Sequence, residues 1–188
     1  MINSDESIPV KGGSSGSIKI KNKIKNETLL INLDYLQMAA ERIWRIPDRI
    51  IKGDTNRNLK HSEHIADIIS SLIEMHKGSA LSEDELYLLL TGIYLHDIGI
   101  QLDVAVFSDI LNEAENLGAK FNIDFSAKNA SSYSIEEQRE LRENHHFIGA
   151  AWISYANRTG RTMLGEAAKG IPPKLLSDVI EICKFHSN

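Results

Sequence analysis

The two residues best suited to chemistry are adjacent: His96 and Asp97 close an apolar run that begins near Leu86. Apolar side chains recur in this run at helical period, so we expect a buried helix that Gly99 ends. An imidazole and a carboxylate are costly to bury beside apolar surface unless both have partners. A divalent cation would be a partner for both. The pair is therefore a candidate metal site, and a purely structural ion pair is the alternative.

Further candidate ligands are histidines in other predicted helices. His61 lies on the apolar stripe of one helix, which we expect to face the core. His145 and His146 stand where another helix changes from charged to apolar, and His186 follows the last apolar stripe. Imidazole and carboxylate ligands together suit the divalent ions of Mn, Fe, Co, Ni or Zn, and an open position on such an ion would activate water.

The elements that must position these residues read as helices. Ser82 with Glu85, and Ser134 with Glu137, have the spacing of capping boxes and predict two helix starts. The segment 119–133 is rich in aromatic, Asn and Ser residues and is expected to be an irregular loop over a cleft. We expect about six helices, near residues 32–46, 60–77, 83–98, 104–117, 134–157 and 172–186.

The N-terminal segment differs in composition from the rest. Residues 12–17 contain only Gly and Ser, which are typical of a flexible linker. The alternation of Ile and Lys over residues 18–21 would also fit a short edge strand, but we favour a poorly ordered arm. The predicted fold is therefore all-α, with a flexible arm or linker at residues 1–28 and a single helical domain at residues 29–188.

Composition excludes several classes of protein. A chain of 188 residues with 42% hydrophobic residues suits one well-cored domain, and a net charge of -5 disfavours a nucleic-acid partner. The single cysteine, Cys183, excludes an internal disulfide and disfavours a thiolate-rich zinc site. No apolar stretch approaches the roughly 20 residues needed to span a bilayer, and no signal peptide is evident. We expect no membrane association and a cytoplasmic location.

In chain order these residues resemble the HD superfamily of metal-dependent phosphohydrolases. The resemblance covers roughly residues 55–188, which we expect to form an HD-domain-like helical bundle. It rests on His61-Ser62-x-x-Ile65-Ala66, Leu95-His96-Asp97-Ile98-Gly99, Arg142-x-x-His145-His146-x-x-Gly149-Ala150 and, more loosely, Ile182-Cys183-x-x-His186.

The resemblance implies a set of metal ligands. His61, His96 and Asp97 match the family's principal ligands, while His145 and His186 match auxiliary ones. His145 is preferred to His146 because it stands four residues before Gly149, as in the family motif. The ligand atoms of His61, His96, Asp97 and His145 should then lie within about 5 to 6 Å of one another.

The resemblance also implies a function, the hydrolysis of a phosphoester such as a nucleotide or a related small substrate. A divalent metal ion, one of Mn, Fe, Ni, Co, Zn or Mg, would lower the pKa of a bound water. Asp97 would be the catalytic residue, binding the metal and orienting the water. The alternative is a non-catalytic metal- or nucleotide-sensing regulatory module of a larger multidomain protein. A plain helical interaction domain with incidental histidines is a third hypothesis.

One departure from the family pattern concerns the C-terminus. The family's final Asp comes from a helix beyond the one that reaches His186, whereas this sequence ends at Asn188. We expect either a domain truncated at its C-terminus or a site closed by histidines alone, with weak metal binding and slow turnover. The spacing is also similar to that of HD domains fused to a GHKL-type ATPase, which implies a fused C-terminal ATPase module as a partner.

Overall fold

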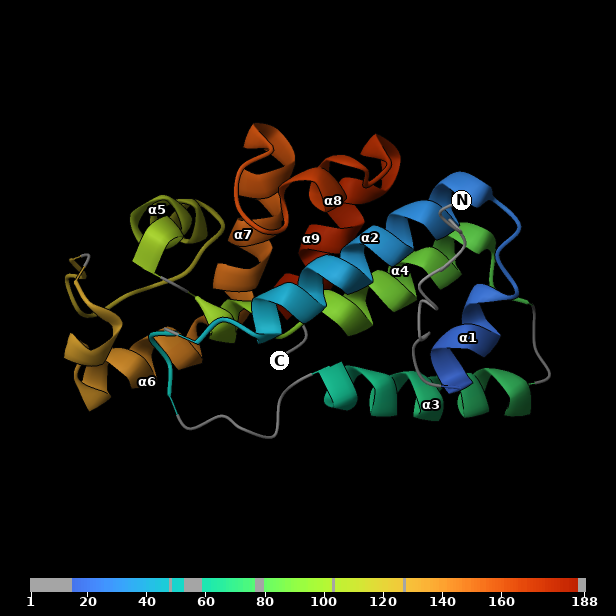
Figure 1. The fold of residues 1–188 in the computed structure, drawn as a ribbon, viewed down its shortest axis with the longest axis horizontal. Coiled ribbons are helices and arrows are strands. Elements are labelled where there is room, and N and C mark those ends of the chain that lie inside the picture. Colours follow the sequence, from blue (N-terminus) through green and yellow to red (C-terminus); the bar gives the residue numbers. More distant parts are fainter. Residues whose placement is uncertain are drawn as a thin grey trace, which may run out of the picture.

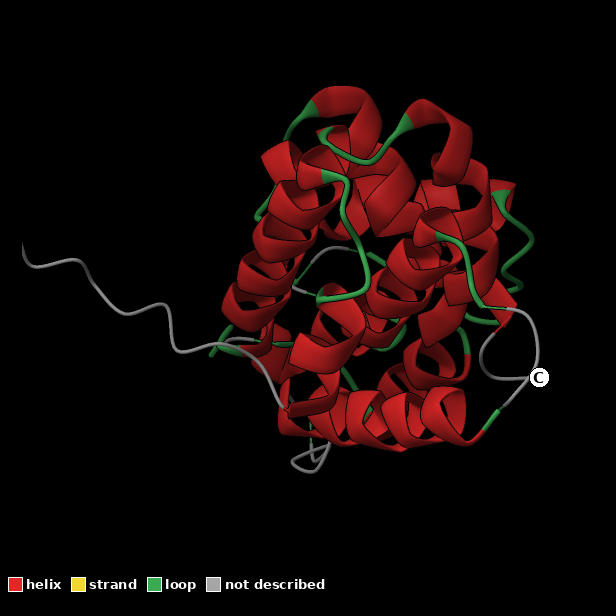
Figure 2. Ribbon diagram, turned by 90° about the vertical axis from the view of Figure 1, so that its right-hand side faces the viewer, coloured by secondary structure: helices red, strands yellow, loops and turns green. Residues whose placement is uncertain are grey.

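The computed structural model of the chain describes residues 15–47, 49–52, 59–76, 80–102, 104–126 and 128–185. Across these ranges the elements are nine α-helices and three short 3-10 helices, with no strand, so the all-α prediction is confirmed (Figures 1 and 2). Within the same ranges no helix is both long and apolar enough to cross a bilayer. In chain order the elements are α1 (Ser15–Lys21), α2 (Glu27–Trp44), α3 (Leu59–Met75), α4 (Glu83–Leu95), η1 (Ile98–Gln101), η2 (Val104–Val106), α5 (Phe107–Asn116), η3 (Ala130–Ser132), α6 (Ile135–Glu143), α7 (His145–Thr159), α8 (Gly165–Lys169) and α9 (Pro173–Phe185).

Helix α4 is the central element of the bundle. It packs against α2 and α9 and also contacts α1 and α3, so it is buried from Leu90 to Leu95 without interruption (Figure 1). Helix α7 is the second organising element, because it contacts α5, α8, α9 and η1. The chain segment 96–97 lies between α4 and η1, and therefore between these two packing centres.

Both predicted capping boxes are present. The Ser82 hydroxyl accepts a hydrogen bond from the Glu85 backbone N–H, and the Glu85 carboxylate accepts one from the Ser82 N–H at 2.7 Å. Ser134 and Glu137 make the same reciprocal pair at the start of α6. Each box satisfies N–H groups that the first turn of a helix leaves without an intrahelical acceptor.

The single helix predicted for residues 134–157 is in fact two, α6 and α7. The break is at Asn144, whose backbone has φ −100° and ψ 9°. The Asn144 amide donates hydrogen bonds to the carbonyls of Glu140 at 3.0 Å and Lys120 at 3.3 Å. Asn side chains compete in this way for backbone groups and favour helix ends over helix interiors. Because of this break, His145 is the first residue of a new helix, α7.

The structure also differs from the prediction at residues 15–28. Residues 15–21 form the helix α1, not an edge strand or part of a linker, and α1 packs against α3 (Figure 1). Gly16 and Ser17 are buried there, and the Gly16 N–H donates to the Asp67 carboxylate at 2.6 Å. Small residues permit this close approach, although their composition is typical of linkers. Residues 1–14 of the predicted arm lie outside the described residues.

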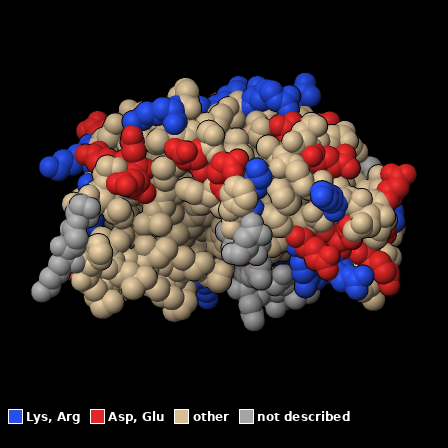
Figure 3. All heavy atoms as spheres, turned by 180° about the vertical axis from the view of Figure 1, so that it is seen from behind, with Lys and Arg blue, Asp and Glu red and all other residues tan. Residues whose placement is uncertain are grey.

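The apolar stripe of α3 that begins at His61 faces the core only in part. Ile68 and Leu72, which continue this stripe, have 48% and 53% of their surface exposed, whereas Ser62, Ala66 and Ser70 are buried. The physical reason is the contact with α1, which admits only small side chains between the two helices. Seen from behind, the side of the molecule on which α3 lies has a broad area without charged atoms (Figure 3).

The α1–α3 contact predicts a stability effect at Gly16. A Cβ at this position would lie 2.5 Å from both the Ala66 carbonyl oxygen and the Asp67 Cα, which are backbone atoms that cannot move aside cheaply. We expect Gly16→Ala to lower the free energy of unfolding by about 1–3 kcal/mol, as overpacking does. Urea denaturation measures this, with Ser15→Ala, at an exposed position of the same helix, as the control. Equal stabilities of the two variants would contradict the close contact.

Candidate metal centre

The Asp97 carboxylate is the centre of a cluster of imidazoles. It is buried, with 3% of the side chain exposed, and it stands two residues after Leu95, the last residue of α4. Its Oδ2 lies 3.1 Å from the Nε2 of His96 and 3.9 Å from the Nε2 of His61 on α3. Its Oδ1 lies 3.3 Å from the Nε2 of His145, the first residue of α7. Three helices thus converge on one carboxylate.

Backbone carbonyl groups fix the orientation of two of the rings. The Nδ1 of His96 lies 3.0 Å from the Ile93 carbonyl oxygen, and the Nδ1 of His145 lies 2.6 Å from that of Arg142. Because a carbonyl oxygen only accepts hydrogen bonds, each Nδ1 carries a proton and donates. In the neutral ring, Nε2 is then the nitrogen with the lone pair, and it is this nitrogen that faces Asp97.

This arrangement has the properties of a divalent metal site. Lone pairs on Nε2 and on a carboxylate oxygen repel each other unless a proton or a cation lies between them. One ligand atom from each of His61, His96 and Asp97 can be chosen so that all lie within 4.8 Å of one another. A hydrogen bond from the other ring nitrogen to a carbonyl is also the usual support of a metal-binding histidine. The donors therefore fit a first-row divalent ion.

A close backbone contact brings His145 to this point. A Cβ on Gly99 would lie 2.6 Å from the Gly149 nitrogen and would also collide with the His145 carbonyl oxygen. The absence of a side chain at Gly99 is what lets η1 lie directly against the start of α7. The prediction that Gly99 ends a helix is wrong, because α4 already ends at Leu95. The role of Gly99 is to let the backbone of η1 approach the backbone of α7 closely.

The structure brings together four of the five predicted ligands, His61, His96, Asp97 and His145. The fifth, His186, lies outside the described residues. His146, the histidine that the resemblance did not favour as a ligand, has its ring against that of Phe147, at a centroid distance of 4.4 Å. The sequence does not indicate which carbonyl groups orient His96 and His145, because every residue type has a backbone carbonyl.

Cys183 is a neighbour of the site, although nothing in its sequence position indicates contact with Asp97. Burial, and to a smaller extent the negative charge of Asp97, together raise the pKa of the Cys183 thiol to about 12. Since the thiol is neutral below that pH, it is not an activated nucleophile. A cysteine in this position adds packing beside the carboxylate.

The contact at Gly99 predicts a coupled loss of stability and metal binding. We expect Gly99→Ala to cost about 1–3 kcal/mol of unfolding free energy and to displace His145 from Asp97. The matched variant is Gly92→Ala, whose Cβ would meet only the Ile182 side chain, with its Cγ2 nearest at 2.7 Å. That side chain can rotate away, so the effect should be smaller. Denaturation and Mn titration of both variants measure the difference, and a larger effect at Gly92 would contradict the assignment.

A second prediction separates two histidines of the same helix. His61 faces Asp97, whereas His64 is exposed on α3. We expect His61→Ala to weaken Mn binding at least about tenfold, because it removes a nitrogen donor, and His64→Ala to leave it unchanged. Calorimetric titration measures both affinities. An equal effect of the two substitutions would show that His61 is no ligand.

Comparison with protein families identifies the domain. The family model HD-CE matches residues 41–188, a range that contains all four clustered residues. Comparisons with curated proteins and with solved structures each gave no match. The matched residues are an HD-like domain, with a His61, His96 and Asp97 group compatible with a metal ion. From this match, the chain belongs to the HD-CE family.

Proposed function

We propose that the chain is a metal-dependent phosphohydrolase that cleaves a phosphoester at the Asp97 cluster. One observation carries the proposal: the Nε2 atoms of His96 and His145 face the same buried carboxylate, while their Nδ1 atoms donate to helix carbonyls. The HD-like domain supports it, because the resemblance to HD phosphohydrolases rests on the same residues.

The metal would be held by His61, His96, Asp97 and His145, with His186 as a further proposed ligand. Imidazole-rich donor sets favour first-row ions such as Mn, Fe, Co, Ni or Zn over Mg, which prefers oxygen ligands. A bound divalent ion supplies Lewis-acid chemistry, neutralising charge on phosphate oxygens and making water a stronger nucleophile. The carbonyl-anchored rings supply donors that need no reorientation to bind it.

The residues of the chain have distinct roles in this proposal. Asp97 accepts a hydrogen bond from the attacking water and orients it toward phosphorus. The His61 side chain is 38% exposed, against 14% for His96 and 10% for His145, so the substrate approaches from the α3 side. One carboxylate does not neutralise a divalent ion, and the remaining positive charge attracts a phosphoester anion such as a nucleotide.

A second candidate function is a regulatory module that binds a metal or a nucleotide without turnover. This function is favoured by the small number of negatively charged ligands, because among the described residues the clustered group contains one carboxylate. A site of this kind holds a divalent ion less tightly than one with two or three carboxylates. In a larger protein, the partner would be a fused ATPase whose activity depends on whether this site holds its metal or nucleotide.

Hydrolysis of bis(p-nitrophenyl) phosphate tests the proposal. We expect slow turnover that requires Mn, stops with EDTA and falls at least about 100-fold in Asp97→Asn, because the substitution removes the carboxylate that all three rings face. Asp178→Asn, an exposed acid on α9, is the control with the same change of charge and should keep the activity. Turnover that survives Asp97→Asn would contradict the proposal, and stoichiometric Mn binding without turnover would select the regulatory module.

A further inference from the structure

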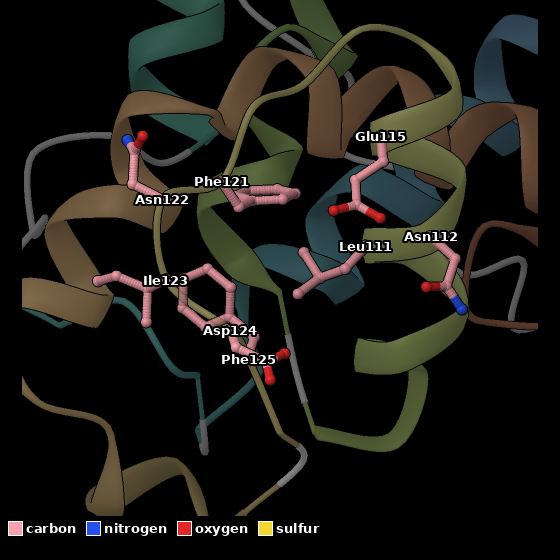
Figure 4. Close-up of a pocket in the computed structure, with 8 residues that line it drawn as sticks. All are labelled: Leu111, Asn112, Glu115, Phe121, Asn122, Ile123, Asp124 and Phe125. Atoms are coloured by element: carbon pink, nitrogen blue, oxygen red, sulfur yellow. The ribbon is translucent and has the colours of Figure 1, made fainter.

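A cavity of about 340 Å³ lies between the C-terminal half of α5 and the loop that follows it (Figure 4). Phe121 of the loop and Glu115 of α5 extend toward each other across it. Its volume is within the range of about 300–1,000 Å³ that small-molecule pockets occupy. None of its lining residues belongs to the Asp97 cluster. They are Leu111, Asn112, Glu115, Phe121, Asn122, Ile123, Asp124 and Phe125.

Aromatic rings form one wall of this cavity. Phe121 and Phe125 pack edge to face, with a centroid distance of 5.4 Å and an interplanar angle of 87°. Phe125 in turn contacts the buried Phe107 of α5 at 6.1 Å, again nearly perpendicular. Ring faces carry negative electrostatic potential and attract cations. A ring face of this wall that is open to the cavity would attract a cation.

The charged groups of the cavity are both acidic. Glu115 and Asp124 line it, and among the described residues no Lys or Arg does. Within the described chain neither carboxylate has a hydrogen bond or an ion pair. Other acids close by are engaged: Asp109 with a tyrosine hydroxyl, Glu113 with an arginine and a serine, and Glu140 with an asparagine amide. The two lining carboxylates thus remain available to a ligand.

The loop that carries the aromatic wall is anchored. The buried Glu140 carboxylate accepts hydrogen bonds from the Asn122 backbone N–H at 2.7 Å and from its side-chain amide at 3.0 Å. One residue before Phe121, Lys120 exchanges hydrogen bonds with the Asn144 side chain. These contacts fix the loop to the α6–α7 junction, so a ligand would enter a cavity already formed, with little ordering cost.

We propose that this cavity binds an organic cation, namely a primary ammonium or guanidinium group on an alkyl stem. The stem contacts Leu111, Ile123 and the phenylalanine rings, while the cationic head lies against the ring faces between Glu115 and Asp124. An anion of the same size is repelled by both carboxylates. A neutral isostere keeps the apolar contacts but loses the charge interactions. The same ammonium chemistry is offered by a free alkylamine and by a lysine side chain of another protein.

Titration with n-butylammonium chloride, followed by the backbone amide signals of residues 121–125 in NMR spectra, tests this site. We expect saturable shifts at millimolar ligand that weaken with added salt, and none from butyrate or 1-butanol at the same concentrations. Equal binding of 1-butanol would overturn the proposal, as would the absence of saturable shifts with n-butylammonium.

Variants assign the binding to the named residues. We expect Glu115→Gln and Asp124→Asn each to weaken the affinity about threefold, and together about tenfold, as for exposed charge pairs. Phe121→Leu removes a ring face and should cost about threefold as well. Asp178→Asn, the same charge change on α9, should have no effect, and acidic variants indistinguishable from it would overturn the proposal. Titration with N-acetyl-lysine methylamide distinguishes the two sources of the ammonium group. If it binds more tightly than n-butylammonium, the natural ligand is a lysine side chain of another protein. If it binds more weakly, the natural ligand is a free amine.

Discussion

The buried carboxylate of Asp97 sets the main physical constraint on this structure. A carboxylate with 3% exposure would be strongly destabilising without compensation, because burial removes the water that stabilises its charge. The bundle directs three imidazole nitrogens at the two carboxylate oxygens, and a proton or a cation held between them compensates the buried charge. Those rings come from α3, the end of α4 and the start of α7, so the carboxylate is also the point at which these elements must meet.

Two backbone features make that meeting possible. The break at Asn144 gives α7 a start at His145, three residues after the Arg142 carbonyl that holds the ring. The bare backbone of Gly99 then lets this start lie against η1, which follows Asp97. His96 uses the same device on α4, with the Ile93 carbonyl three residues earlier. Both rings are thus oriented by carbonyl groups in the last turn of a helix, where the regular i to i+4 hydrogen bonds end.

The sequence was informative where chemistry and periodicity agreed. Capping boxes at Ser82 and Ser134 have a spacing that few other structures use, and they predicted two helix starts correctly. The adjacent polar pair after an apolar run correctly marked His96 and Asp97 as buried or nearly so. The resemblance to the HD motif, in which the histidine stands four residues before the position of Gly149, favoured His145 over His146, and the structure places His145 against Asp97.

The features that were missed depend on contacts between distant segments. The composition of Gly16 and Ser17 is typical of a linker, but in the structure they lie in a helix that packs against Ala66 of α3. The same contact leaves Ile68 exposed, although the apolar pattern predicts that it is buried. Apolar periodicity counts large side chains and overlooks packing through small ones. The cavity beside Phe121 likewise needs the loop and α5 together, although the aromatic composition of residues 119–133 indicated a loop over a cleft.

In the proposed function, a divalent ion is held at Asp97 by imidazoles from three helices. The most direct measurement is an anomalous difference map from Mn-soaked crystals, collected on both sides of the Mn absorption edge. We expect one strong peak bounded by the Nε2 atoms of His61, His96 and His145 and by the Asp97 carboxylate, and no such peak in crystals of Asp97→Asn. A Mn peak elsewhere in the molecule, with none at Asp97, would contradict it.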